Sequence, residues 1–171
     1  MGEGKVTDRA ARARAQWERE RPDLELLPME VIGRLNGAAL VIGRDHLAPL
    51  FAEHGLQRGE FDVVATLRRA GKPYRLTPTE LYESLMMSSG GMTARLDRLE
   101  KAGLIERRPN PDDRRGTLVG LTRKGLTLID KLVGLHVENE RRILSCLTQA
   151  EQKELNRLLA KLLNGLAEGE G

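Results

Sequence analysis

Apolar residues recur every three or four positions along most of the chain, a pattern typical of amphipathic helices packed on a common core. Helices are predicted over residues 7–21, 28–44, 46–54, 57–70 and 122–147, with a last helix after Thr148. Proline or glycine follows several of these segments, as expected where a helix ends. The residues predicted to face inward are Ile32, Leu35, Ala39 and Ile42 in the second helix, Phe61, Val64 and Leu67 in the fourth, and Leu128, Leu132, Leu135 and Ile143 in the fifth.

The pattern changes in the middle of the chain, where two short helices and two short strands are predicted. Thr77 is a suitable N-cap (as is Thr7 for the first helix), Pro78 suits the first helical position, and Glu80 completes a capping box. A serine of the following Met-Met-Ser-Ser segment can cap a second helix that ends near residue 102, with Gly103 as its left-handed C-cap. Two helices joined by so short a turn are typical of a helix-turn-helix.

The two sides of this second helix differ in a way that suits DNA binding. At about 100° per residue, Met92, Leu96 and Leu99 form an inward stripe, and small or polar residues occupy the opposite side. Small residues allow a helix to enter a major groove, where hydroxyls and cations meet the flanking phosphates. An ordinary amphipathic surface helix is the alternative. The residues predicted to contact DNA on this helix and its start are Ser88, Ser89, Gly90, Thr93, Ala94 and Arg98.

Two strands are predicted at residues 104–108 and 117–121, on either side of a segment rich in turn-forming residues. That segment, residues 109–116, contains the adjacent arginines Arg114 and Arg115. A hairpin with two arginines near its tip is the basic wing of a winged helix-turn-helix, and it favours DNA binding over a plain surface helix. The predicted fold is therefore mainly α with a small β-wing.

The last predicted helix contains more leucine than one flank of a small domain usually needs. A dimer interface built from the terminal helices would bury this leucine stripe, and packing within a single chain is the alternative. A two-fold dimer would place two recognition helices about 34–36 Å apart, which is one turn of DNA. The leucines, spaced three or four residues apart, are Leu155, Leu158, Leu159, Leu162, Leu163 and Leu166.

Composition supports nucleic-acid binding only weakly and argues against several other classes of protein. The 171 residues include 28 lysines and arginines, and the net charge of +3 is compatible with a DNA partner but not specific to one. The sequence contains no stretch of membrane-spanning length, no apolar signal region and only one cysteine, so a cytoplasmic protein is predicted. It contains no phosphate loop or nucleophile elbow, so we predict no enzyme and no cofactor.

The cysteine and the histidines are predicted to have structural rather than chemical roles. Cys146 lies among leucines near a helix end, where buried packing is expected. A redox sensor, the alternative, would need an accessible thiol of low pKa. His46, His54 and His136 lack the spacing of metal ligands, so no metal site is predicted.

A long central segment resembles the recognition helix and wing of the MarR family of transcriptional regulators: SSGGMTARLDRLEKAGLIERRPNPDDRRGTLVGLTRKG. The resemblance implies a homodimer that binds a short palindromic site on double-stranded DNA, usually as a repressor, and that is released by a small molecule. It also implies that Asp113 braces one wing arginine while Arg115 or Arg114 enters the minor groove. The implied parts are an N-terminal extension helix at residues 1–27, N-terminal dimerisation helices at 28–55, the winged helix-turn-helix at 56–121 and C-terminal dimerisation helices at 122–171.

A narrower resemblance is to the urate-responsive, PecS-like branch of that family. It rests on the N-terminal extension, the run RGEFDVVATLRRAG and the sequence MTARLDRLE. In that branch a tryptophan of the extra N-terminal helix, an aspartate of the helix before the helix-turn-helix and an arginine of the recognition helix form the ligand pocket. The matching residues are Trp17, Asp62 and Arg95, which implies a small anionic effector such as urate. A phenolic or other aromatic carboxylic acid is the alternative.

The residues themselves support part of this assignment. Arg95 lies about 60° from the centre of the inward stripe, on the flank of its helix rather than on the DNA side. None of its helical neighbours is acidic, so an arginine half-buried there needs a carboxylate from another element or an anionic ligand. Asp62 is the candidate carboxylate, and Arg58 is its local alternative partner. A plain Asp62–Arg95 ion pair without ligand, and plain packing of Trp17, stay open as alternatives.

A ligand that captured Arg95 would displace the DNA-reading helix, and this differential contact would couple ligand binding to DNA release. A ligand-independent DNA-binding protein is the rival hypothesis, because it would share the helix-turn-helix without using these three residues.

Overall fold

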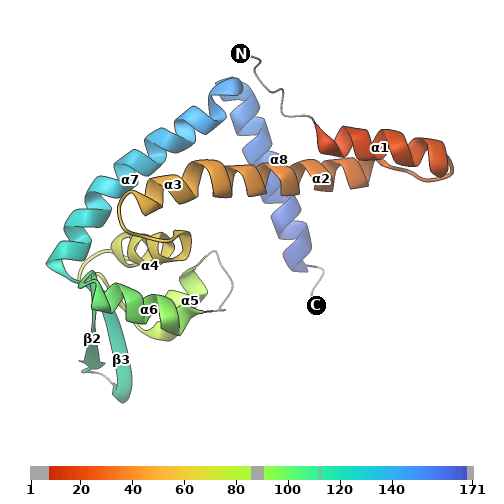
Figure 1. Ribbon diagram of the computed structural model, residues 1–171. Helices are drawn as coiled ribbons and strands as arrows, with labels where there is room; N and C mark the ends of the chain where they lie inside the picture. The colour runs from red at the N-terminus through yellow and green to blue at the C-terminus, as the bar shows by residue number, and fades with distance from the viewer. Residues whose placement is uncertain (1–7, 86–90, 112, 169–171) are drawn as a thin grey trace. The chain divides into compact units, whose positions relative to one another are not determined.

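The computed structural model of the chain describes residues 8–85, 91–111 and 113–168, which belong to two compact units (Figure 1). The first unit is Met1–Pro49 and the second is Leu50–Gly171. The side chains of Arg114 and Arg115 are not described.

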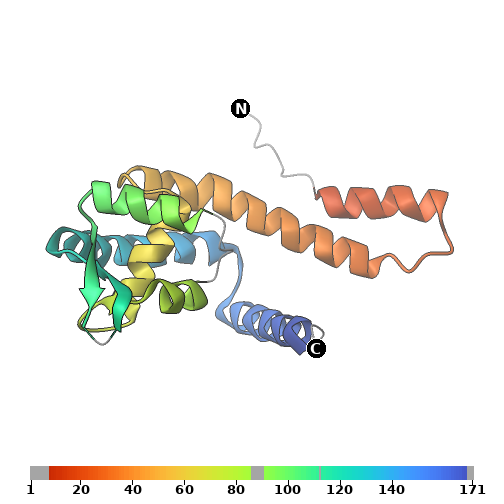
Figure 2. The same cartoon turned by 90° about the horizontal axis from the view of Figure 1, so that it is seen from below.

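The N-terminal unit is a pair of antiparallel helices, α1 (Arg9–Glu20) and α2 (Leu27–Val41), which lie side by side in both views (Figures 1 and 2). Asp8 is the N-cap of α1, because its side chain accepts a hydrogen bond of 3.0 Å from the amide of Ala11. The predicted cap, Thr7, lies outside the described residues. Pro28 occupies the first turn of α2, where a missing N–H costs nothing.

The predicted break between residues 44 and 46 is wrong. A π-helical segment, η1 (Ile42–Leu47), continues α2 without interruption and is followed by α3 (Ala48–Ala52). The amide of Ala48 donates to the carbonyl of Gly43, five residues earlier. A wider turn of this kind keeps the chain helical where the sequence pattern loses its period.

The second unit contains the predicted winged helix-turn-helix. Its elements are α4 (Arg58–Arg69), β1 (Arg75–Leu76), α5 (Pro78–Ser84), α6 (Met92–Lys101), β2 (Ile105–Asn110), β3 (Asp113–Leu121), α7 (Arg123–Ile143), the 3₁₀ turn η2 (Leu144–Cys146) and α8 (Gln149–Glu168). The described strands form one antiparallel sheet of order β1-β3-β2, in which Arg107 lies opposite Val119 and Arg75 opposite Gly120. The short strand β1 was not predicted.

The core of this unit lies between α4, α5, α6, the sheet and α7. Phe61, Val64 and Leu67 of α4 are buried as predicted, and the rings of Phe51 and Phe61 stack with centroids 4.3 Å apart. Leu96 and Leu99 of α6 are also buried, while Met92 is half-buried. Aliphatic side chains supply most of the remaining packing: Leu81, Leu104, Ile105, Val119, Ile129 and Leu132.

The predicted start and stop signals of the helix-turn-helix are confirmed where the chain is described. Thr77 and Glu80 form a reciprocal capping box at the start of α5. Gly103 follows α6 with φ +69°, a backbone conformation that glycine adopts without strain. The predicted serine cap lies outside the described residues, and α6 begins after Gly91, whose φ is +80°.

The wing strands are longer than predicted. Pairing continues past Arg108 to Asn110, and β3 begins at Asp113, so most of the expected turn segment belongs to the strands. The register shifts between Pro109 and Asn110. Because proline cannot donate to a strand ladder, an irregularity at this point allows pairing to resume beyond it.

Several apolar stripes predicted to be buried are exposed in the single chain. Ile32 and Leu35 of α2 and Leu135 of α7 are more than a third exposed, whereas Ile129, which was not predicted, is fully buried. An apolar residue at a helical spacing can face either the core of its own chain or a partner, so the pattern alone does not separate the two. The α8 leucines, which were predicted to form a dimer interface, are also exposed in the single chain, except the half-buried Leu159.

Cys146 is also exposed, contrary to the expectation of buried packing, because the chain leaves α7 in a 3₁₀ turn at this point. A second capping box, formed by Thr148 and Glu151, lies at the start of α8. In the described parts of the chain, no helix is long and apolar enough to cross a membrane.

Candidate DNA interface and effector site

The C-terminal end of α6 is fixed to the beginning of α7. The Thr122 hydroxyl donates to the carbonyl of Gly103 at 2.7 Å, and Lys124 Nζ donates to the carbonyl of Ala102 at 2.7 Å. A Cβ added at Gly125 would lie 2.0 Å from the carbonyl oxygen of Leu104, so only glycine allows this close approach. The candidate recognition helix is therefore held at its end by backbone contacts, which limits its independent movement there.

The opposite side of α6 presents small residues to solvent. Gly91, Thr93 and Ala94 are exposed, as groove entry requires. Arg98 is exposed as well, but its Nε donates to Glu60 of α4 at 2.6 Å, and Glu60 is buried. Bringing Arg98 to a phosphate would compete with this ion pair. The predicted contacts Ser88, Ser89 and Gly90 lie outside the described residues.

At the wing, two arginines of β2 have carboxylate partners. Arg107 pairs with Asp97 at 2.7 Å and with Glu100 at 2.5 Å, and so joins the wing to α6. These contacts raise the pKa of Arg107, with the Asp97 hydrogen bond as the main cause. Arg108 pairs with Glu106 at 2.7 Å. The DNA-directed positive charge predicted for the wing therefore depends on Arg114 and Arg115.

Asp113 begins β3, next to those two arginines. Its carboxylate lies close to Gly116 of the same strand, because a Cβ added at Gly116 would be 3.0 Å from Asp113 Oδ2. Its role as brace of an arginine remains a prediction.

The predicted effector residues Asp62 and Arg95 belong to the same unit. Arg95 is half-buried on α6, and its guanidinium covers Gly59 in the first turn of α4: a Cβ added at Gly59 would lie 2.5 Å from Arg95 Nε. Asp62 lies one turn further along α4 and is also half-buried. Asp62 and Gly59 are three residues apart on α4, so Asp62 lies on the side of α4 that the Arg95 guanidinium covers.

Burial raises the pKa of the Asp62 carboxyl above its ordinary value of 3.8. Positive charges oppose this shift, in the order Arg58, His136, Arg95 and Arg69. Within the described structure, neither Asp62 nor Arg95 forms a hydrogen bond or ion pair with a protein side chain. The direct Asp62–Arg95 bridge and the local Arg58–Asp62 pair, both considered above, are therefore absent, and a half-buried carboxylate and a half-buried guanidinium are left without direct partners.

Trp17, the third predicted effector residue, belongs to the other unit. It lies on α1 and is 44% exposed, so the alternative of plain packing is not met within the single chain.

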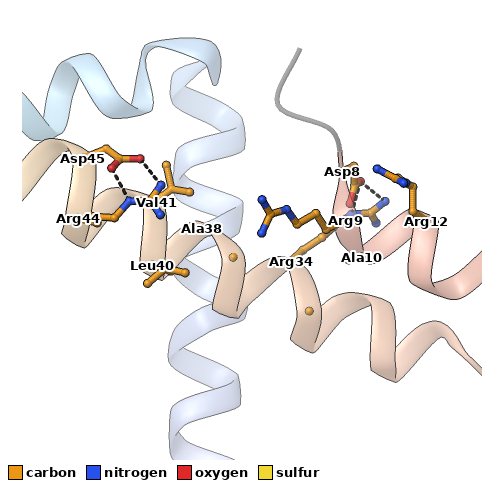
Figure 3. A pocket seen from close by; sticks show the side chains of 12 residues that line it. Asp8, Arg9, Ala10, Arg12, Arg34, Ala38, Leu40, Val41, Arg44 and Asp45 are labelled. Carbon is orange, nitrogen blue, oxygen red and sulfur yellow. Dashed lines mark hydrogen bonds and ion pairs between the residues drawn. The ribbon is translucent and has the colours of Figure 1, made fainter. Parts of the chain in front are cut away.

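A groove in the N-terminal unit was missed by the sequence analysis. It has a volume of about 670 Å³ and lies between the start of α1 and the second half of α2 (Figure 3). Arginines surround it, but two of them already have carboxylate partners: Arg34 of α2 pairs with Asp8 at 2.8 Å, and Arg44 of η1 pairs with Asp45 at 2.5 Å. The sequence feature that could have predicted this groove is the pair of small residues Gly33 and Gly37, one helical turn apart.

Two of the three histidines have neighbours within their own unit. His136 packs against the rings of Phe51 and Phe61, and its Nε2 lies 3.1 Å from Glu140. His54 Nδ1 lies 3.1 Å from the carbonyl of Leu50. The described residues contain no group of three or more potential metal ligands.

Comparison with known proteins gives consistent results. The MarR family profile matches residues 54–116. The chain is 45% identical over 147 residues to the HTH-type transcriptional regulator PecS of Dickeya dadantii (strain 3937), covering 86% of this chain and 88% of that relative. It is 34% identical over 143 residues to the multiple antibiotic resistance protein MarR of Escherichia coli (strain K12), covering 81% of this chain and 93% of that one.

A solved structure agrees with these matches. A mutant MarR from E. coli complexed with operator DNA superposes with a TM-score of 0.69 at 29% identity, covering 86% of this chain and 97% of that chain.

Proposed function

The chain belongs to the MarR family of DNA-binding transcriptional regulators, and on this premise we propose that it is a ligand-responsive repressor. In this proposal a homodimer binds a palindromic operator, and a small anion releases it. Urate is the favoured anion because the chain is similar to PecS over most of its length and has a tryptophan, an aspartate and an arginine at the positions expected for the urate-responsive branch.

The proposed DNA contacts are the small residues at the start of α6 and the arginines of the wing. Thr93 and Ala94 are exposed on α6, so they are available to base edges and phosphates in a major groove. Arg114 or Arg115 is proposed to enter the minor groove, braced by Asp113. Ser88, Ser89, Gly90 and Arg98 complete the proposed surface, with Arg98 leaving Glu60 when it meets a phosphate.

The single observation on which the effector proposal depends is the state of Arg95. This arginine lies on the DNA-reading helix, is half-buried against Gly59, and lacks a direct carboxylate partner among the described residues. A desolvated guanidinium without a partner is a strong binding position for an anion. The nearby Asp62 carboxyl can exchange hydrogen bonds with the polar edge of the same ligand, and Trp17 is proposed to stack on its planar face.

Release follows if the anion binds Arg95 more tightly when α6 is displaced than when α6 reads DNA. A coupling free energy of about 1–3 kcal/mol would weaken operator binding roughly 5–150-fold. An aromatic carboxylic acid or a phenol is the second candidate ligand, because it offers the same combination of planar ring and negative charge.

A gel-shift titration on the DNA upstream of the protein's own gene tests this function. We expect a retarded complex that urate dissociates and that a neutral purine of similar size does not. Salicylate is the matched probe for the second candidate. A complex that resists every anion would contradict the effector proposal and leave a ligand-independent DNA-binding protein. Calorimetric titration of the free protein with the same compounds would then separate absence of binding from binding without release.

A further inference from the structure

The helix that bears Trp17 has no apolar anchor within the chain. None of the residues of α1 (Arg9–Glu20), all of which the structure describes, is buried, and most are charged or alanine. A short helix that is polar on most sides does not hold its position by hydrophobic burial, so other contacts must fix it.

Those contacts converge on one carboxylate of α2. Glu30 is only 6% exposed and is the sole buried residue of that helix, whose whole length is described. Arg14 of α1 pairs with it at 2.7 Å, and Arg34 of α2 pairs with it at 2.7 Å. Arg34 also pairs with Asp8, the N-cap of α1, at 2.8 Å (Figure 3).

The two helices approach each other closely beside this network. A Cβ added at Gly33 would lie 3.1 Å from the Cβ of Ala10, so a larger residue at Gly33 would push α1 away. Glu30 is therefore connected to the middle of α1 directly, through Arg14, and to its N-cap indirectly, through Arg34 and Asp8. A buried carboxylate is stable only while these partners remain in place. The position of α1 on α2 therefore depends on the negative charge of Glu30.

Trp17 follows Arg14 by three positions, so the two side chains lie on neighbouring parts of the same helix surface. We propose that Glu30 is the positioning residue for Trp17: its buried carboxylate, held by Arg14 and Arg34, fixes α1 on α2 and so presents the tryptophan for effector binding. The presentation of Trp17 to an effector rests on the proposed function, whereas the anchoring of α1 on α2 does not.

The expected change in effector response follows from the fraction of molecules in which α1 is docked on α2. If the effector binds only molecules in which α1 is docked, a variant docked for about one tenth of the time requires about tenfold more effector for half-release. Operator binding without effector should be unchanged, because the DNA-reading elements belong to the other unit. A variant that simply failed to fold would lose operator binding as well as the response to the effector.

The test compares Glu30→Gln with Glu18→Gln. Glu18 pairs with the same arginine, at 2.8 Å, but it is exposed and lies on α1 itself, so that pair does not join the two helices. Trp17 is the only tryptophan in the chain, and its fluorescence anisotropy reports the motion of α1 directly. We expect Glu30→Gln to lower the anisotropy and raise the half-release concentration of urate about tenfold, while Glu18→Gln changes neither.

A second variant tests the same ion pair in case Glu30→Gln fails to fold. Arg14→Gln removes the α1 side of the pair from a partly exposed position, and it should reproduce both effects. Unchanged anisotropy in Glu30→Gln and Arg14→Gln would overturn the anchoring role. Lowered anisotropy with an unchanged urate response would overturn the link to effector binding. If the wild type itself fails to respond to urate, the proposed function fails, and the anisotropy comparison still decides whether Glu30 anchors α1.

Discussion

The guanidinium of Arg95 lies directly over Gly59, so closely that a Cβ on Gly59 would be 2.5 Å from Nε and 2.9 Å from Cζ. The first turn of α4 thus forms the floor under the only arginine of α6 proposed to hold an effector. Because the colliding atoms belong to the end of a flexible side chain, a methyl group at residue 59 would move Arg95 rather than the backbone.

Gly59→Ala should therefore weaken the response to urate without lowering the stability of the fold. Replacing a helical glycine by alanine stabilises by about 0.5–1 kcal/mol, so the melting temperature should be unchanged or higher. The displaced Arg95 should nevertheless raise the urate concentration needed for operator release. Gly134→Ala in α7 is the matched control, because a Cβ there meets nothing within 4 Å, and it should keep the wild-type response. A normal response in Gly59→Ala would show that the position of Arg95 is irrelevant to the effector.

Asp62 should lower the stability of the free protein at neutral pH. Burial raises its pKa above 3.8. Between pH 3.8 and this higher pKa, the folded protein retains a proton on Asp62 that the unfolded chain has already lost. The ionised carboxylate therefore destabilises the fold above the folded pKa, and this penalty disappears as the pH falls below 3.8. Asp62→Asn should melt at a higher temperature than wild type near neutral pH, with the difference vanishing in acid, and should respond less to urate. A lower melting temperature at neutral pH would mean that the carboxylate makes a stabilising contact.

The exposed leucines of α8 should hold the dimer together. Leu162 is 38% exposed in the single chain, and each fully buried leucine contributes about 1.5–3 kcal/mol. Dimerisation would bury only this exposed share, and a two-fold dimer contains two copies, so Leu162→Ala should weaken dimerisation by about 1–2 kcal/mol and reduce operator affinity with it. Helix content should not fall, since alanine is the better helix former. Sedimentation equilibrium measures the change, with Lys161→Ala as the control. An unaltered dimer would place the interface elsewhere.

Arg115 should contribute a phosphate or minor-groove contact without any role in assembly. Arg115→Ala is expected to weaken operator binding and to reduce the slope of log affinity against log salt by about 1, because one fewer counterion is released. Arg19→Ala, on exposed α1, should leave both quantities unchanged. If Arg115→Ala instead produced monomers, the hairpin could not be a separate wing.

Local signals predicted the helix-turn-helix well, because capping is a matter of neighbouring residues. Thr77 with Glu80, and Gly103 after α6, determine helix ends through bonds within a few positions. The α4 stripe was equally clear, since its apolar residues face one core. The wing length was not predictable in this way, because strand pairing past Pro109 depends on the opposite strand.

Contacts between distant segments explain what the sequence did not reveal. Arg98 was assigned to DNA from its position on the helix, but its partner Glu60 is 38 residues away. The close approach of Arg95 to Gly59 and the burial of Glu30 between two arginines also depend on tertiary packing. Helical spacing likewise does not distinguish a core stripe from an interface stripe, which is why Ile32, Leu35 and Leu135 were expected to be buried in one chain.

The central claim is that one arginine on the DNA-reading helix couples effector binding to operator release. Titrating urate into operator complexes of wild type and Arg95→Ala, matched for initial occupancy, tests it most directly. The account predicts that wild type dissociates, whereas Arg95→Ala remains bound over the same concentration range. Equal loss of operator binding by the two proteins would contradict it.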